Sequence, residues 1–228
     1  MSHIKNYRFT DLLHYHCHAV DGELGKVEDI LYDPHTRKVR YLLLRTGSWH
    51  FGHDILVDPA SIVALDGLTN LIEVNCPRSH YRNSPEIDRA LPFSRHYEEQ
   101  YQAHFAQASR RANLDTQEPD QLLTETPASV SEFTHDYPQL TRCEHILGLK
   151  LSDNEVCFAQ VADLILEEPA WQISNLEVEL KNTGTSGTEG RRHWIPANKV
   201  INVNLSDRKI SMDVTRQQLS EDSAKLAT

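Results

Sequence analysis

Apolar and polar positions alternate near the start of the chain. In residues 13–20, apolar side chains take turns with histidines: Leu13, His14, Tyr15, His16, Cys17 and His18. Successive side chains of a β-strand point to opposite faces of its sheet. The pattern therefore predicts a strand with one apolar face and one histidine-bearing face.

Short apolar segments of the same kind follow this strand. They are separated by turn sequences that contain Gly, Asp or Pro, and they lie at 27–33, 39–46, 55–57, 62–65 and 71–76. The alternation slips near Asp29, which indicates a β-bulge. Short strands and turns at regular spacing are typical of a small barrel or sandwich.

The apolar pattern occurs twice along the chain. One constant offset in sequence places Val27 on Val161 and Leu42 on Leu176. A loop insertion in the second copy then lengthens the offset, and the longer offset places Val57 on Ile195. We expect two structurally equivalent copies, with these core positions buried: Leu42, Leu44, Leu176 and Val178.

The chain between the copies has helical spacing. Tyr97, Tyr101 and Phe105 recur at every fourth position, so they form one apolar stripe on a helix predicted over 94–111. A polar segment with several prolines follows this helix and reads as a linker. We expect the stripe to cover the first copy, and its alternative role is a partner-binding face.

Together these patterns predict a mainly β fold of two small barrels joined by a helical linker. The first barrel is expected over residues 1–76 and the second over 140–228. Residues 77–139 hold the helix and the polar linker.

The turn and strand sequences of the first copy resemble those of the PRC-barrel family. The resemblance lies in VDGELGKVED at 20–29, VRYLLLRTGSW at 39–49 and ILVDP at 55–59, and the second copy is similar through Trp171 and Trp194. The family includes the cytoplasmic domain of the photosynthetic reaction-centre H subunit. The resemblance implies two PRC-type barrels that serve as binding platforms. No catalytic motif accompanies that fold.

The charge is acidic and evenly spread, with a net value of −10. Binding to a nucleic-acid backbone or to anionic lipid requires clustered Lys and Arg, and the sequence has no such cluster. No apolar run reaches the ~20 residues of a membrane span. The four cysteines form no CxxC pair, which favours reduced thiols and a cytoplasmic location. A protein partner is expected, and a homodimer is one form of it.

Two sets of side chains are candidates for chemistry. His14, His16 and His18 share one strand face, so they are candidate metal ligands for a sensor or a metal-dependent enzyme. The alternative is a solvated outer face. Asp29 recurs as Asp163, either as an acid–base pair or as an acceptor for backbone N–H groups near the bulge.

The sequence shows no nucleophile–base arrangement and no cofactor loop. We therefore expect no enzymatic activity, no catalytic residues and no cofactor. The favoured function is a non-enzymatic binding or scaffold protein that docks on a partner macromolecule, in the assembly or regulation of a larger complex. The metal-binding sensor or enzyme is the alternative.

Overall fold

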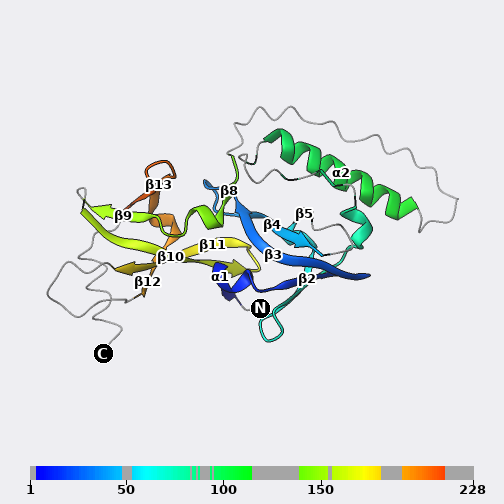
Figure 1. Cartoon of the computed structure of the whole chain (residues 1–228), viewed down its shortest axis with the longest axis horizontal. Helices are drawn as coiled ribbons and strands as arrows, with labels where there is room; N and C mark the ends of the chain where they lie inside the picture. Colours follow the sequence, from blue (N-terminus) through cyan, green and yellow to red (C-terminus); the bar gives the residue numbers. More distant parts are fainter. Residues whose placement is uncertain are drawn as a thin grey trace.

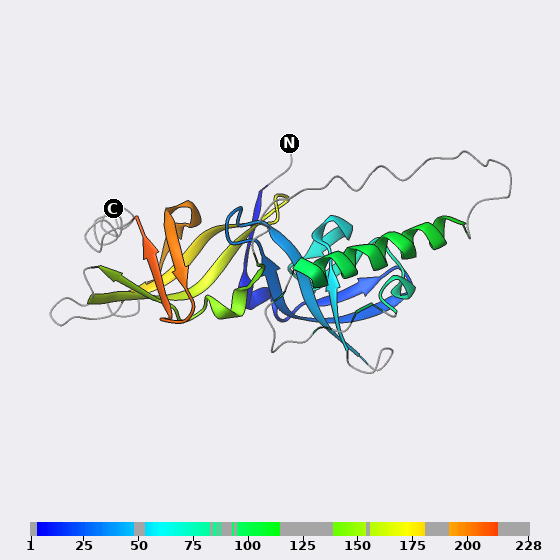
Figure 2. The same ribbon diagram turned by 90° about the horizontal axis from the view of Figure 1, so that it is seen from above.

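A computed structural model describes most of the chain. The described residues are 4–47, 53–82, 84–85, 87, 93, 95–114, 139–153, 156–180 and 192–213. We call the part up to residue 82 the first half and the part from residue 139 the second half. Within the described residues the fold is mainly β, with two seven-stranded sheets. Figures 1 and 2 show the two sheets side by side along the long axis of the molecule.

The first sheet has the strand order β5-β4-β3-β2-β7-β6. Its strands are β2 (His16–Ala19), β3 (Gly22–Tyr32), β4 (Val39–Thr46), β5 (Asp54–Val57), β6 (Ile62–Asp66) and β7 (Leu71–Val74). Neighbouring strands are antiparallel except β2 and β7, which run parallel.

The second sheet repeats this order as β12-β11-β10-β9-β14-β13. Its strands are β9 (Lys150–Asp153), β10 (Val156–Glu168), β11 (Gln172–Leu180), β12 (Arg192–Pro196), β13 (Val200–Asn204) and β14 (Lys209–Met212). The parallel pair recurs as β9 and β14.

Local irregularities recur with the same offsets as the sequence repeat. A bulge lies between Val27 and Asp29 in β3, and its counterpart lies between Val161 and Asp163 in β10. Asn70 and Arg208, which the longer offset places on each other, have φ values of 54° and 52°. The predicted repeat and the predicted bulge are therefore confirmed.

The repeat does not by itself establish that either sheet closes into a barrel. Among the described residues, no hydrogen-bonded pairing joins β5 to β6 or β12 to β13. Two closed barrels therefore stay a prediction.

The prediction for the first strand was wrong at its start. The chain enters through β1 (Lys5–Arg8) and a short helix α1 (Phe9–Leu12), and strand β2 begins only at His16. The expected alternation still appears, because Tyr15 and Cys17 are buried while His14 and His16 are exposed.

Helix α2 (Arg95–Leu114) matches the helix predicted between the copies. Figures 1 and 2 show it lying across the first sheet, on the side of β4 and β5. The polar linker predicted after it falls mainly at 115–138, outside the described residues.

Both halves contribute to one main hydrophobic core. The predicted core residues are all within it: Leu42, Leu44, Leu176 and Val178. Their exposed fractions are 0%, 0%, 3% and 0%. A smaller cluster lies under α2 and includes Leu43, Leu56 and Tyr101.

Candidate functional site: the junction and the outer sheet faces

Each half gives its first strand to the other half's sheet. Strand β1 pairs with β10, placing Arg8 opposite Ile165. Strand β8 (Thr141–Arg142) pairs with β3, placing Arg142 opposite Leu31. The first offset of the repeat relates these two pairings to each other, so the exchange is reciprocal. The predicted division into 1–76, 77–139 and 140–228 follows the repeat, but the sheets draw strands from across it.

The exchange is accompanied by reciprocal backbone hydrogen bonds between two turns. The Val39 N–H donates to the Trp171 carbonyl at 2.8 Å, and the Ile173 N–H donates to the Arg37 carbonyl at 2.9 Å. The isolated bridge between Lys38 and Gln172 lies between these bonds. Together these contacts place a pseudo-two-fold axis at the junction.

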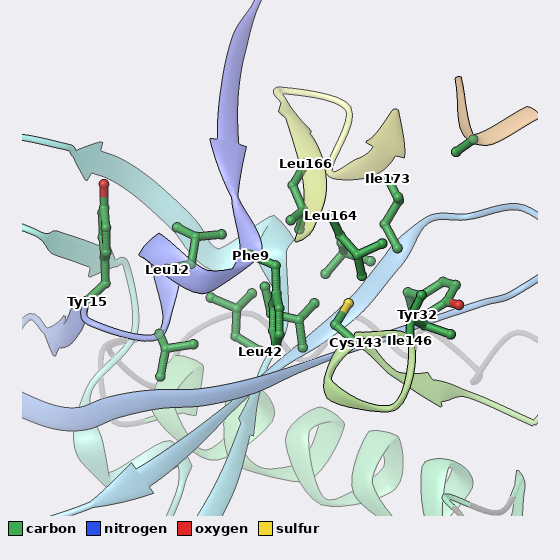
Figure 3. Close-up of a cluster of buried hydrophobic side chains, with 14 of the residues drawn as sticks. Phe9, Leu12, Tyr15, Tyr32, Leu42, Cys143, Ile146, Leu164, Leu166 and Ile173 are labelled. Atoms are coloured by element: carbon green, nitrogen blue, oxygen red, sulfur yellow. The ribbon is translucent and has the colours of Figure 1, made fainter. Parts of the chain in front are cut away.

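Apolar side chains fill the junction between the halves. Figure 3 shows Phe9 and Leu12 of α1 in one cluster with Leu42 of the first sheet and Leu166 of the second. Phe9 and Leu12 are 0% exposed. The segment that carries β1 is thus anchored by packing as well as by strand pairing.

Asp163 accepts hydrogen bonds from the incoming chain of the first half. Its Oδ1 accepts the N–H groups of Leu164 at 2.8 Å and of Thr10 at 3.2 Å. The Thr10 hydroxyl donates to Oδ2. Asp163 therefore joins the bulge of β10 to the start of α1, and both of its carboxylate oxygens have partners.

Asp29 occupies the equivalent position in the first half, but its carboxylate accepts one hydrogen bond fewer than that of Asp163. Its Oδ1 accepts the N–H groups of Ile30 at 2.7 Å and of Glu144 at 3.2 Å. Glu144 occupies the position that Thr10 has in the other half, so no hydroxyl reaches Oδ2. That atom is buried without a hydrogen-bond partner among the described residues.

Burial raises the pKa of Asp29 to about 7. The N–H of Ile30 opposes this rise in pKa, and the nearby Glu144 carboxylate adds to it. Both aspartates accept backbone N–H groups, which is one of the two roles that the sequence predicted for them. Each aspartate contacts the entering segment of the other half.

The outer face of the first sheet is covered by α2. The N–H of Leu56, on the edge strand β5, donates to the Tyr101 hydroxyl at 2.9 Å, and this hydroxyl donates to the Leu56 carbonyl. Burial raises the pKa of Tyr101 well above its usual value, so the hydroxyl keeps its proton. One side chain thereby satisfies both backbone groups at the sheet edge.

An ion pair adds to this cover. Arg40 of β4 donates to Glu98 of α2 at 2.6 Å, and the Tyr41 hydroxyl donates to the same carboxylate at 3.2 Å. Glu98 lies one turn before Tyr101, so the two residues contact neighbouring strands from the same helix face.

The outer face of the second sheet has different side chains at the equivalent positions. Trp194 stands where the first half has Leu56, and Glu177 stands where it has Leu43. Trp194 is 50% exposed, whereas Leu56 is 0% exposed. No described residue pairs with the outer edge of β12.

Glu177 is buried within a polar network on this face. Arg8 donates to its Oε1 at 2.6 Å, and Arg192 donates to its Oε2 at 3.2 Å. The indole N–H of Trp194 donates to Oε1 at 3.2 Å. Both arginine side chains keep a substantial exposed fraction, 39% for Arg8 and 50% for Arg192.

The histidines of the predicted metal site do not gather into a ligand set. His16 and His18 lie on β2, His14 lies in the turn before it, and His16 contacts Glu23 through Nδ1 at 2.7 Å. Within the described part of the chain, no three His, Cys, Asp or Glu side chains are grouped to hold a metal ion. The metal alternative stays a prediction.

The predicted partner-binding stripe lies against the first sheet. Tyr101 is 2% exposed, while Tyr97 and Phe105 are half-buried. The expected cover is therefore confirmed. A partner-binding role for these residues stays a prediction, and it requires α2 to leave the sheet.

Sequence reasoning missed the exchanged strands and the Glu177 network. One signal was present: the offset that places Val27 on Val161 also places Arg8 on Arg142, upstream of the segment taken as the repeat. The repeat therefore begins before the first apolar strand. The destination of those upstream residues depends on contacts between the halves, which a repeat alone does not specify.

Comparison with protein-family models finds no match, and comparison with curated proteins finds none either. Among the described helices, none has the length and apolar character needed to cross a membrane.

Proposed function

We propose that this protein is a non-enzymatic docking protein of the PRC-barrel type, working in the cytoplasm, and that a protein partner binds the outer face of β11 and β12. The observation that carries the proposal is the unequal cover of two equivalent sheet faces. Leu56 is buried under α2, and its counterpart Trp194 is half exposed.

The chain itself provides a template for the partner. Helix α2 covers the first face with an aromatic hydroxyl at the strand edge and a carboxylate paired to a nearby arginine. The second face offers the edge of β12, the Trp194 ring and two partly exposed arginines. We therefore assign to the partner an amphipathic helix with an aromatic and an acidic residue one turn apart.

Two further features support this proposal. The two halves are locked together by exchanged strands and a shared core, which suits a rigid platform rather than a hinge. All four cysteines are free thiols, as expected in a reducing compartment. The metal-dependent alternative is tested separately, by metal analysis of purified wild type and a His16→Ala variant.

A photo-crosslinking residue at position 194 tests the docking site in the native host. Position 68 is the control, because Leu68 is 97% exposed and lies away from this face in the turn before β7. We expect position 194 to cross-link to a helical segment of another protein and position 68 to give no such product.

Three outcomes contradict the proposal. Equal cross-linking from positions 194 and 68 would mean that the products reflect exposure to solvent and not a specific docking site. Cross-links from 194 to residues 214–228 of the same chain mean that the face is covered internally. Cross-links to a second copy, together with a dimer mass in light scattering, assign the face to a homodimer.

A further inference from the structure

A cavity opens in the second half beside the pseudo-two-fold turn. Its volume is about 300 Å³. The floor is apolar and is formed by buried core side chains: Leu164, Leu176 and Ile210. The rim, which is the more exposed part of the lining, carries polar side chains from both halves: His35, Arg37, Thr141 and Asn202.

The pseudo-symmetry accounts for the cavity. At the pseudo-symmetric counterpart of the cavity, Tyr7 stands at the position of Thr141 and Trp171 at the position of Arg37. Both aromatic rings pack against the core, and the Tyr7 hydroxyl donates to Glu168 at 3.1 Å. The cavity thus has Thr141 and Arg37, which are smaller or more flexible, where its pseudo-symmetric counterpart has two packed rings.

Arg37 is held at the rim by its backbone. Its carbonyl accepts the N–H of Ile173 across the pseudo-two-fold axis, and its own N–H donates to the Asp33 carbonyl at 2.7 Å. Its φ is 62°, and Trp171 at the equivalent position has a φ of 46°. The turn therefore accepts either side chain in the same conformation.

The Arg37 guanidinium has no ion pair or side-chain hydrogen bond among the described residues. The nearest acidic group in sequence, the Asp33 carboxylate, accepts the N–H groups of His35 and Thr36. A half-buried arginine without an acidic partner, placed above an apolar floor, suits a ligand with an anionic head and an apolar body.

We propose that this cavity binds a small monocarboxylate with an apolar tail, its carboxylate on Arg37 and its tail against Leu164, Leu176 and Ile210. A volume of about 300 Å³ has room for about ten water-sized groups. A monocarboxylate of the length of octanoate fits within this volume. This site is separate from the docking face at Trp194 and does not depend on it.

Calorimetric titration with octanoate tests the proposal, with octan-1-ol and octylamine as matched neutral and cationic probes. We expect octanoate to bind most tightly, octan-1-ol more weakly, and octylamine weakest. Arg37→Gln should weaken octanoate binding by about tenfold, the size of one charge-assisted contact, and leave octan-1-ol unchanged. Lys38→Gln removes an exposed neighbouring charge and should change neither.

Thr141→Tyr copies the side chain that stands at the equivalent position in the first half. It should abolish binding of both octanoate and octan-1-ol, because the ring occupies the cavity. If the melting temperature of Thr141→Tyr falls well below that of wild type, this variant is not folded well enough to test binding. The test then rests on the comparison of Arg37→Gln with wild type. The proposal is overturned if octanoate does not bind, if octylamine binds equally well, or if folded Thr141→Tyr binds like wild type.

Discussion

A single hydroxyl distinguishes the two buried aspartates at the junction. Asp163 receives hydrogen bonds on both carboxylate oxygens because Thr10 offers its N–H and its hydroxyl. Asp29 receives an N–H from Glu144 at the same place but no hydroxyl. A buried oxygen without a donor stabilises the protonated form, which agrees in sign with the pKa of Asp29, raised by burial to about 7.

The raised pKa makes stability depend on pH. The folded state holds the Asp29 proton more tightly than the unfolded state, whose carboxyl has the ordinary pKa of 3.8. The stabilisation is therefore complete below about pH 4 and is lost as the pH rises to about 7. Asp29→Asn keeps an oxygen for the two N–H donors but does not titrate.

We expect Asp29→Asn to reduce the difference in unfolding free energy between pH 5 and pH 8 by on the order of 2 kcal/mol. Urea denaturation of both proteins at the two pH values measures this. An unchanged pH dependence in the variant would show that Asp29 is ionised throughout this range.

The missing donor can be supplied by substitution. Glu144→Thr places at the junction the residue that serves Asp163, and it also removes the ion pair of Glu144 with Arg142. Its unfolding free energy at pH 8 should therefore exceed that of Glu144→Ala by about 1 kcal/mol. Glu144→Ala is the control, because it removes the same charge without adding a hydroxyl. Equal effects of the two variants would mean that the added hydroxyl contributes nothing.

At the scale of elements, α2 covers the edge of the first sheet at β5. An edge strand with free N–H and carbonyl groups is a site of unwanted pairing, and Tyr101 occupies both groups of Leu56. The helix was predictable from the spacing of Tyr97, Tyr101 and Phe105. Its contact with a strand backbone was not, because spacing does not say which strand a hydroxyl will reach.

Tyr101→Phe removes this hydroxyl and keeps the ring. The Leu56 groups are then buried without a partner, so the unfolding free energy should fall by about 1–3 kcal/mol. Denaturation in urea measures the change. Gln107→Ala is the control, since this residue of α2 is exposed. A loss no larger than that of the control would mean that the hydroxyl contributes nothing to the sheet edge.

At the scale of the whole molecule, the two copies of the repeat form an internal pseudo-dimer about the pseudo-two-fold axis at the junction. Alternation and the constant offset between the copies predicted the strands, the bulge at Asp29 and the buried leucines. The exchange of β1 and β8 lay beyond that reasoning, because pairing within a copy and pairing between copies satisfy the same apolar pattern. The two sheets therefore share one core, with Phe9 and Leu12 at its centre.

Hydrogen exchange of the wild type and a Phe9→Ala variant tests this shared core most directly. Phe9 is 0% exposed at the junction, so its truncation should cost about 3–5 kcal/mol. If the halves form one cooperative unit, amide protection in β3 and β4 should fall by the same free energy as in β10 and β11. Protection that falls in one sheet and is retained in the other would contradict the account, because the halves would then unfold as separate domains.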